Sequence, residues 1–217
     1  MIFEWRRSRL WRDPERADAT GLVAIGGDLS PERLLEAYRR GIFPWYDEEL
    51  PICWWSPDPR AIFELDRFHV SRRLQRTCRS SRFQVSFDQA FSEVIRGCAD
   101  RPGQGTWITS EMVDAYEALQ RLGYAHSVEV WKENQLSGGI YGVAVGSLFA
   151  GESMFSRCTD ASKVALVHLV DRLRERGFQL FDIQFLNAHT ARLGAVEIPR
   201  TEYLARLRTA LECQPTF

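Results

Sequence analysis

The sequence lacks the features that mark membrane-spanning and exported proteins. No apolar run approaches the ~20 residues that a bilayer span requires. The first seven residues, MIFEWRR, lack the apolar core of a signal peptide. Hydrophobic residues make up 45% of the chain and charged residues 26%, a balance typical of soluble globular proteins. We therefore expect a cytoplasmic protein without a membrane partner.

Signatures of metal-assisted and covalent catalysis are also missing. The five cysteines are scattered, form no CxxC pair and have no histidine at metal-ligand spacing, so we expect reduced thiols. There is no P-loop and no GxSxG motif around a nucleophilic serine. These absences predict neither a metal site nor a cofactor, and they leave covalent catalysis without a good nucleophile.

Lysine is scarce, so arginine supplies nearly all of the positive charge. Lys132 and Lys163 are the only lysines, and the net charge is −1. A bias in genome composition explains this ratio, but the positions of the arginines are uneven. Residues 60–82 hold seven arginines against Glu64 and Asp66. Such a cluster favours phosphate contacts, or equally a solvated helix face. The candidate residues are Arg72, Arg73, Arg76, Arg79 and Arg82.

Periodicity and capping residues predict a mixed α+β fold. Ser30 and Pro31 are suited to begin a helix over 31–40, Ser71 one over 72–78 and Asp88 a third. Residues 41–60, rich in Trp and Pro, predict no regular element, and we place a domain boundary near 60. The other expected helices are 110–122, 160–177 and 201–211, and the expected strands are 82–87, 125–131, 136–145, 147–156 and 178–185, forming a mostly antiparallel sheet.

Polar residues in three stretches are the site candidates. Asp182 and Gln184 lie two apart on the strand predicted around 180, so they share a face, which we expect to be a cleft if Phe181, Ile183 and Phe185 face the core. A structural pairing of Asp182 with an arginine is the competing interpretation. Glu152 follows an apolar run, where a carboxylate is either a binding group or the anchor of a turn. His189 follows Asn187, and a structural role is more common for such a histidine. The tryptophans of 41–60 either pack a loop on the core or form a platform for a planar ligand.

Seven motifs together resemble one family. They are GGDLSP (26–31), RGIFPW (40–45), WWSPDPR (54–60), GTWIT (105–109), AHSVEVW (125–131), GESMFS (151–156), and DIQ with LNAHT (182–184 and 186–190). In order and without large gaps, they resemble the leucyl/phenylalanyl-tRNA–protein transferases, bacterial enzymes of the N-end rule pathway. The resemblance covers residues from about 20 to 200.

This resemblance implies a small N-terminal α/β domain (1–60) and an acetyltransferase-like (GNAT-like) domain (61–217). It implies transfer of Leu, Phe and, less well, Met from aminoacyl-tRNA to proteins that begin with Arg or Lys, without a cofactor. Asp182 and Gln184 match the catalytic positions. The positions implied for substrate binding are Trp45, Trp107, Phe149, Glu152, Ser153, Asn187 and His189, together with Ile140, where the family pattern has Met. We further expect a monomer, with the arginine cluster contacting the acceptor stem.

The chemistry requires a neutral amine to attack the aminoacyl ester. Gln184 would orient the amine or polarise the ester carbonyl, while Asp182 would either accept the proton or hold Gln184 and the ammonium in place. An ordinary Asp, with a pKa of ~3.9, is a weak base for an amine with a pKa of ~7.7–8.0. That mismatch favours the orienting role unless burial raises the carboxyl pKa.

Two other functions remain open at this point. An acyl-CoA N-acyltransferase would need a pyrophosphate loop, for which the glycine loop at 101–105 is misspaced, and it would bind CoA. A non-enzymatic RNA-binding module would use the tryptophans and arginines but leave Asp182, Gln184 and Glu152 unexplained. Labelled Leu-tRNA and an Arg-starting peptide distinguish this module from the transferase.

Overall fold

The fold comes from a computed structural model that describes residues 13–47, 49–100 and 106–217. Residues 1–12, which include Trp5 and Trp11, lie outside this description. So does the 101–105 part of the glycine loop.

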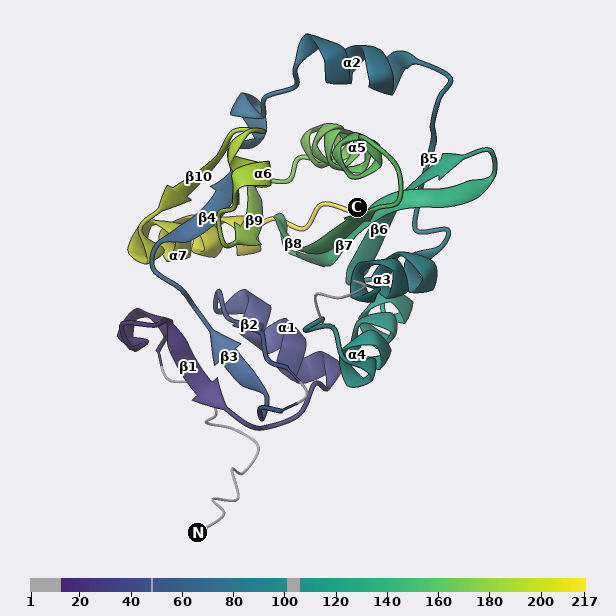
Figure 1. Cartoon of the computed structure of the whole chain (residues 1–217). Helices are drawn as coiled ribbons and strands as arrows, with labels where there is room; N and C mark the ends of the chain where they lie inside the picture. The colour runs from purple at the N-terminus through teal and green to yellow at the C-terminus, as the bar shows by residue number, and fades with distance from the viewer. Residues whose placement is uncertain (1–12, 48, 101–105) are drawn as a thin grey trace.

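Two sheets organise the described chain (Figure 1). A small antiparallel sheet has the order β1-β3-β2, formed by Leu22–Ile25, Cys53–Trp55 and Phe43–Pro44. The larger sheet has the order β10-β4-β9-β8-β7-β6-β5, and its neighbouring strands are antiparallel except for the parallel pair β8 and β9. Its strands are β4 Arg60–Phe63, β5 Gln84–Phe87, β6 Ala125–Lys132, β7 Gln135–Val145, β8 Leu148–Ser156, β9 Leu180–Gln184 and β10 Ala195–Ile198. The predicted α+β class on a mostly antiparallel sheet is confirmed.

Helices cover both faces of the larger sheet. α5 lies on one face, and α3 and α4 lie on the other (Figure 1). The helices are α1 Pro31–Arg39, α2 Arg72–Arg79, α3 Phe91–Ala99, α4 Ser110–Arg121, α5 Ala161–Glu175, α6 Ala188–Ala191 and α7 Arg200–Leu211, with short 3-10 turns at Pro14–Arg16 and Leu65–Arg67. The helices predicted at 31–40, 72–78, 110–122, 160–177 and 201–211 are thereby confirmed.

The glycines inside β7 allow both helical layers to approach the sheet closely. A Cβ on Gly138 would lie 2.7 Å from Ala161 Cβ of α5, and one on Gly139 would lie 3.0 Å from Val94 of α3. Successive residues of a strand point to opposite faces, so the two glycines serve the two layers separately. Glycine at these positions therefore permits helix packing on both faces of the strand.

Two local predictions are wrong. Residues 41–60 contain β2 and β3, because the aromatic side chains pack as strand residues: Trp54 is fully buried and its Nε1 donates to Gly26 O at 2.9 Å. Asp88 does not cap α3, whose N-cap is Ala90. Instead Asp88 turns the chain with φ +56°, and its Oδ1 accepts the Ser127 N–H of β6 at 2.8 Å.

The core joins the segments on either side of residue 60. One buried cluster includes Leu34 and Trp54 from the first 60 residues and Val94, Tyr116 and Val143 from the larger part. The expected boundary does separate the residues of the two sheets, since β3 ends at 55 and β4 begins at 60. A division into two domains stays a prediction, with a shared core across it.

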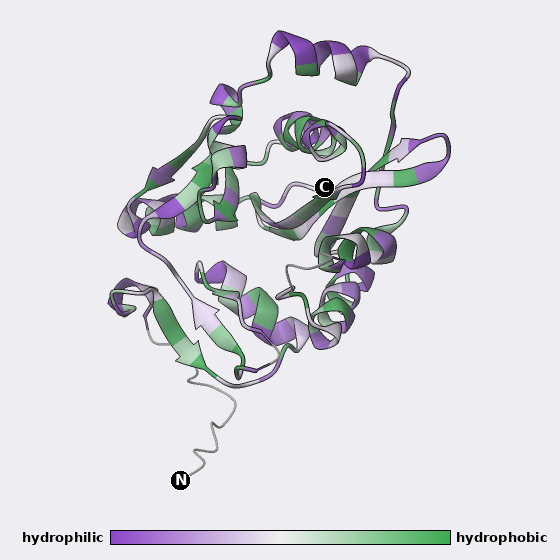
Figure 2. Cartoon of the chain, in the orientation of Figure 1, coloured by the Kyte–Doolittle hydropathy of each residue, from purple (hydrophilic) through white to green (hydrophobic). Residues whose placement is uncertain are grey.

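Helix α2 lies at the edge of the molecule, against α5 (Figure 1). Leu74 is its buried residue, Thr77 and Cys78 are partly buried, and hydrophilic residues predominate along the helix in Figure 2. Ser71 caps the helix as predicted, its hydroxyl oxygen accepting the Leu74 N–H at 3.2 Å. One apolar anchor thus holds a helix whose outer face is free to carry charge.

Candidate active site

Strand β9 carries the predicted catalytic residues Asp182 and Gln184 to the point where its pairing with β8 ends. The parallel pairing of β8 and β9 runs from Leu148–Leu180 to Ala150–Asp182, whereas β8 continues to Ser156. A bulge at Ile183 also interrupts the pairing of β9 with β4, since Asp182 and Gln184 face consecutive residues of β4. A β-bulge re-aims the side chains around it. The strand therefore departs from simple alternation at the candidate site.

Two cavities adjoin at the end of β9. The first, here called the β8–β9 cavity, measures about 270 Å³. The second, here called the aromatic cavity, measures about 300 Å³ and is walled by Phe43, Trp45 and Trp107. The cavities share Glu152, Ile183, Gln184, Phe185 and Asn187. Glu152 and Gln184 therefore lie where the two spaces meet.

The β8–β9 cavity has apolar walls and a polar end. Its apolar lining comes from Phe63, Ile140, Met154, Leu166 and Ile183. Ser153, His189 and Thr190 add polar groups, and burial, with Lys163 and Arg192 nearby, lowers the pKa of His189. This arrangement can hold an apolar side chain while polar groups contact its backbone end.

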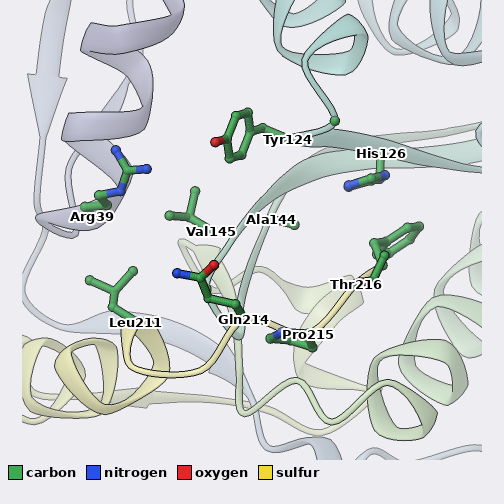
Figure 3. A pocket seen from close by; sticks show the side chains of 12 residues that line it. Arg39, Tyr124, His126, Ala144, Val145, Leu211, Gln214, Pro215 and Thr216 are labelled. Carbon is green, nitrogen blue, oxygen red and sulfur yellow. The ribbon is translucent and has the colours of Figure 1, made fainter.

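A third cavity, of about 460 Å³, lies elsewhere (Figure 3). Arg39, Tyr124, His126 and Gln214 contribute to its lining, and His126 Nδ1 lies 2.8 Å from Asp88 Oδ2. None of the predicted site residues lines this cavity. The sequence motifs therefore converge on the two cavities at β9, although the third is larger.

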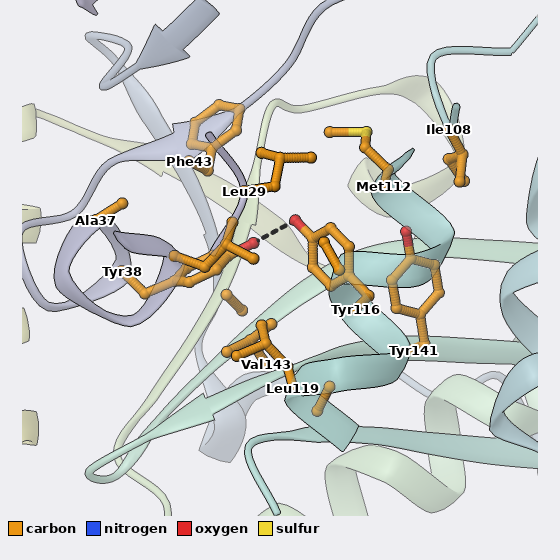
Figure 4. Close-up of a cluster of buried hydrophobic side chains, with 14 of the residues drawn as sticks. Leu29, Ala37, Tyr38, Phe43, Ile108, Met112, Tyr116, Leu119, Tyr141 and Val143 are labelled. Atoms are coloured by element: carbon orange, nitrogen blue, oxygen red, sulfur yellow. Dashed lines mark hydrogen bonds between the residues drawn. The ribbon is translucent and has the colours of Figure 1, made fainter. Parts of the chain in front are cut away.

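Glu152 is held by two buried tyrosines. Tyr38 OH donates to Glu152 Oε1 at 2.8 Å and Tyr116 OH donates to Oε2 at 3.1 Å, while the two phenol oxygens lie 2.6 Å apart (Figure 4). Burial raises the pKa of Glu152 to about 7, although the tyrosine hydrogen bonds act in the opposite direction. The carboxyl group can therefore exchange a proton near neutral pH.

Gln184 connects to this carboxylate from the neighbouring strand. Its Nε2 donates to Glu152 Oε1 at 3.2 Å, and its backbone has φ +58°. Because one end of the amide is committed to the carboxylate, the carbonyl oxygen of Gln184 is the end that can accept an N–H from a ligand. Gln184 can thus orient an amine.

Asp182 occupies a different environment from Gln184. Its side chain is 1% exposed, and its oxygens accept from Arg60 Nε at 2.8 Å and Arg60 Nη2 at 2.7 Å. Tyr203 OH and Gln184 N–H also donate to it, at 2.9 and 3.0 Å. Asp182 lines neither of the two cavities at β9. The structural pairing weighed for this residue is present.

The face predicted for β9 is therefore wrong in part. Phe181 is fully buried, as expected, but Ile183 lines both cavities and Phe185 is 42% exposed. Asp182 faces the buried Arg60 and only Gln184 faces the cleft. The bulge at Ile183 and the left-handed backbone of Gln184 break the two-residue period on which the prediction rested.

Most of the predicted substrate-binding residues come together. Trp45, Trp107, Ile140, Glu152, Ser153, Asn187 and His189 each line one or both of the cavities at β9. Phe149 is the exception. It is 1% exposed and packs against Phe178, Phe181 and Phe217, so it belongs to the core beneath the site.

Sequence reasoning missed the partners of the carboxylates. Tyr38 and Tyr116 lie on the buried faces of α1 and α4, among apolar side chains. A buried tyrosine needs a partner for its hydroxyl group, and that requirement is the signal that could have pointed to Glu152. Nothing in the local sequence connects Arg60 to Asp182, 122 residues away.

The arginine cluster divides into paired and available members. Arg73 makes a bidentate pair with Asp160, through contacts of 2.5 and 2.9 Å. Arg82 lies over the Phe83 ring and donates to Thr159 O at 3.3 Å. Among the residues that the structure describes, no carboxylate pairs with Arg72, Arg76 or Arg79. These three arginines are exposed and spaced to lie along one side of α2.

The described residues contain neither a cluster of metal ligands nor a helix suited to span a membrane. No group of three or more His, Cys, Asp or Glu side chains there is placed to hold a metal ion. No described helix combines the length and apolarity of a transmembrane span. The five cysteines, all among the described residues, form no disulfide with one another, and Cys53 and Cys98 are buried.

Comparisons with known proteins agree along nearly the whole chain. Residues 62–208 match the family model described as leucyl/phenylalanyl-tRNA protein transferase, and residues 27–58 match the model for its N-terminal domain. A leucyl/phenylalanyl-tRNA–protein transferase of Anaeromyxobacter sp. (strain K) is 57% identical over all of this chain and 94% of its own length. One from Klebsiella pneumoniae (strain 342) is 55% identical over 92% of this chain and 86% of its own.

Solved structures resemble the chain more distantly. A GCN5-related N-acetyltransferase from Kribbella flavida has a TM-score of 0.42 at 10% identity, covering 75% of this chain and 58% of its own. A conserved protein of unknown function from Staphylococcus epidermidis has a TM-score of 0.46 at 8% identity, covering 82% and 68%.

Proposed function

The chain belongs to the leucyl/phenylalanyl-tRNA–protein transferase family, and on that basis we propose that it transfers Leu, Phe and, less well, Met to the α-amine of proteins that begin with Arg or Lys. It is an aminoacyltransferase that moves an amino acid from tRNA to protein. The product is marked for degradation by the N-end rule pathway. The enzyme works in the cytoplasm as a monomer and uses no cofactor.

One observation carries this proposal: Glu152 and Gln184 lie hydrogen-bonded where an apolar cavity meets an aromatic one. The aromatic cavity suits the terminal adenosine, because the faces of Trp45 and Trp107 can stack a base. The β8–β9 cavity suits a Leu or Phe side chain against Ile140, Met154 and Leu166. The ester between adenosine and amino acid then lies beside the two polar groups.

The reaction exchanges an ester for an amide. The acceptor amine nitrogen bonds to the ester carbonyl carbon, the bond to the ribose oxygen breaks, the amine loses one proton and the ribose oxygen gains one. At pH 7 roughly one-tenth to one-sixth of a free α-amine, with a pKa of ~7.7–8.0, is already neutral. Because the ester is an activated acyl donor, orientation and charge stabilisation supply most of the acceleration.

Three side chains divide this work. The Gln184 carbonyl oxygen accepts an N–H of the attacking amine and aims its lone pair. Glu152, whose pKa is raised to about 7 chiefly by burial, takes up the proton, since its pKa is close to that of the amine. Asp182 orients and does not act as a base, because it lines neither cavity and the Arg60 guanidinium holds both of its oxygens.

The tRNA approaches along helix α2 in this proposal. Arg72, Arg76 and Arg79 contact phosphates of the acceptor stem, since they are exposed and no described carboxylate pairs with them. Arg73 and Arg82 hold α2 to the body through Asp160 and Thr159, so their part in binding is to place the helix.

One assay tests the function directly. Labelled Leu-tRNA and a peptide beginning with Arg are incubated with the protein, and transfer of label to the peptide is measured. We expect transfer to peptides beginning with Arg or Lys and none to a matched peptide beginning with Asp. Absence of label on all peptides, with an active reference transferase run alongside, would reject the proposal.

A further inference from the structure

Arg60 is a buried arginine that contacts strand β9 and lines neither of the two cavities. It is 1% exposed and grips both oxygens of Asp182, at 2.8 and 2.7 Å. Burial disfavours the charged guanidinium, but Asp182 beside it outweighs this effect and holds the pKa of Arg60 above its usual range. The two parallel hydrogen bonds fix the geometry of the pair.

Tyr203 of α7 completes the surroundings of this pair. Its hydroxyl group donates to Asp182 Oδ2 at 2.9 Å, and the Arg60 guanidinium lies 4.5 Å from its ring centroid. Asp182 thus accepts hydrogen bonds from two rigid groups, the planar guanidinium of Arg60 and the phenol of Tyr203. A carboxylate held in this way has little freedom to rotate.

The remaining contact of Asp182 is with Gln184. Oδ1, the oxygen that Arg60 Nε contacts, also accepts the Gln184 N–H at 3.0 Å. Gln184 adopts φ +58°, a left-handed conformation uncommon for residues other than glycine. Such a conformation persists only where surrounding contacts determine it. The hydrogen bond that the Gln184 N–H donates to Asp182 stabilises the backbone conformation that points the Gln184 side-chain amide at Glu152.

Arg60 also contacts the wall of the aromatic cavity. Its guanidinium lies 4.7 Å from the Phe43 ring centroid, and its Nη1 donates to Gly41 O at 3.2 Å. Phe43 lines the aromatic cavity and meets Phe185 at 5.8 Å between ring centroids. The Arg60 guanidinium therefore contacts both Asp182, which holds the Gln184 backbone, and Phe43, a wall of the cavity assigned to adenosine.

We propose that Arg60 and Tyr203 are positioning residues, which act through Asp182 to fix Gln184 and, through Phe43, to align the aromatic cavity with it. This inference rests on the proposed function, because it supposes that Gln184 orients the amine. In this proposal Asp182 links the Arg60 guanidinium to the backbone of Gln184 and keeps that backbone in place. Neither Arg60 nor Tyr203 touches the reacting atoms.

The test compares Tyr203→Phe and Arg60→Lys with the unchanged protein. Single-turnover rates and KM values for Leu-tRNA and an Arg-starting peptide are measured together with the unfolding midpoint. Tyr203→Phe removes one donor to Asp182 and keeps the ring, so the rate should fall roughly five- to tenfold, the effect of one hydrogen bond. Arg60→Lys keeps the positive charge but loses the two-pronged contact with Asp182. If Gln184 shifts by about 1 Å as a result, the rate should fall on the order of a hundredfold.

Controls separate positioning from folding. Arg200 is also buried and donates to Ser56 O at 2.7 Å, so Arg200→Lys removes a comparable contact away from β9. The proposal requires that the rate of peptide-bond formation fall in both Arg60→Lys and Tyr203→Phe. The rate must not fall in Arg200→Lys, even where its unfolding midpoint is lowered as much as that of the other two variants. If Arg60→Lys does not fold, Tyr203→Phe alone decides.

The outcomes also distinguish this inference from the proposed function. Wild-type single-turnover rates in Tyr203→Phe and in folded Arg60→Lys, with a slow Gln184→Ala variant, would overturn the positioning role and leave the transferase mechanism standing. A wild-type rate in Gln184→Ala would instead remove the mechanism on which the inference rests. Slow variants at all three positions support both.

Discussion

Gln184 Nε2 and Glu152 Oε1 lie 3.2 Å apart, so an amide on β9 and a carboxylate on β8 are joined where the pairing of these strands has already ended. Ligands that enter from either cavity meet both groups together. The proposed mechanism therefore centres on this contact, and not on the Asp182 and Gln184 pair that the sequence suggested.

Replacing Gln184 by Ala should slow transfer without weakening binding of the donor. The side chain is expected to orient the amine, so its loss lowers the single-turnover rate on the order of a hundredfold. KM for Leu-tRNA should stay within about twofold, because adenosine and tRNA contacts are retained. Rapid quenching of single turnovers provides the rate.

Asp182→Asn is the companion variant with a different expectation. It leaves the buried Arg60 without its counter-charge, a change that costs about 3–5 kcal/mol. We expect a lower unfolding midpoint together with slow transfer. Near wild-type single-turnover rates in both Asp182→Asn and Gln184→Ala would contradict the roles assigned to this strand.

Glu152 should give the reaction a pH dependence near neutrality. With a folded pKa of about 7, raised from 4.5 chiefly by burial, Glu152 loses its proton as pH rises through 7 and becomes able to accept one from the amine. The single-turnover rate should therefore rise with an apparent pKa near 7, ahead of the rise caused by the amine itself. Glu152→Gln should abolish the first rise and keep the second. An unchanged profile would argue against Glu152 as the acceptor.

The same carboxyl group should lower stability as pH rises. Its folded pKa lies above its unfolded value, so its stabilising contribution is complete below about pH 4.5 and is lost through pH 7. The difference is of order 1–3 kcal/mol. Denaturant unfolding at pH 5 and pH 8 should show this loss in the wild type and a smaller one in Glu152→Gln.

Arginines on α2 should set the salt dependence of tRNA binding. Replacing Arg72, Arg76 and Arg79 by Ala removes up to three phosphate contacts, and each contact contributes about one unit to the slope of log K against log salt. Arg121, exposed at the end of α4, provides a matched control. Equal slopes for the triple variant and Arg121→Ala would exclude this surface.

Trp45 should contribute to donor binding through its ring face. It is 43% exposed, so its replacement is expected to spare the fold. Trp45→Ala should weaken binding of Leu-tRNA by about 1–3 kcal/mol, while Trp45→Phe should retain part of the stacking. Equilibrium binding at fixed salt measures both. If Ala and Phe bind Leu-tRNA as tightly as Trp, the adenosine does not stack at this position.

Helix caps and hydrophobic periodicity predicted most helices of this fold, whereas contacts between residues far apart in the sequence determine the geometry of the candidate site. Ser30-Pro31, the Ser71 cap and the stripe of α4 are local signals, and each marks a helix that the structure contains. The short strands β2, β3 and β10 carry only two to four residues, too few for periodicity to reveal.

The candidate site shows the same division. The motifs singled out Trp45, Trp107, Glu152 and Gln184, and all four line the aromatic cavity. They could not show that Asp182 turns toward Arg60, because a one-residue bulge at Ile183 reverses the facing of a strand and leaves no trace in its pattern.

In the proposed mechanism, where the β8–β9 cavity holds the amino-acid side chain, Gly138 can alter selectivity although it does not line that cavity. A methyl group there would meet Ala161 Cβ at 2.7 Å and press on the start of α5, the helix that carries Leu166 into the β8–β9 cavity. Moving that helix outward would widen the cavity while leaving its lining residues unchanged. Breadth of donor choice can therefore evolve through the packing of a helix on a strand, without any change in the residues that meet the amino acid.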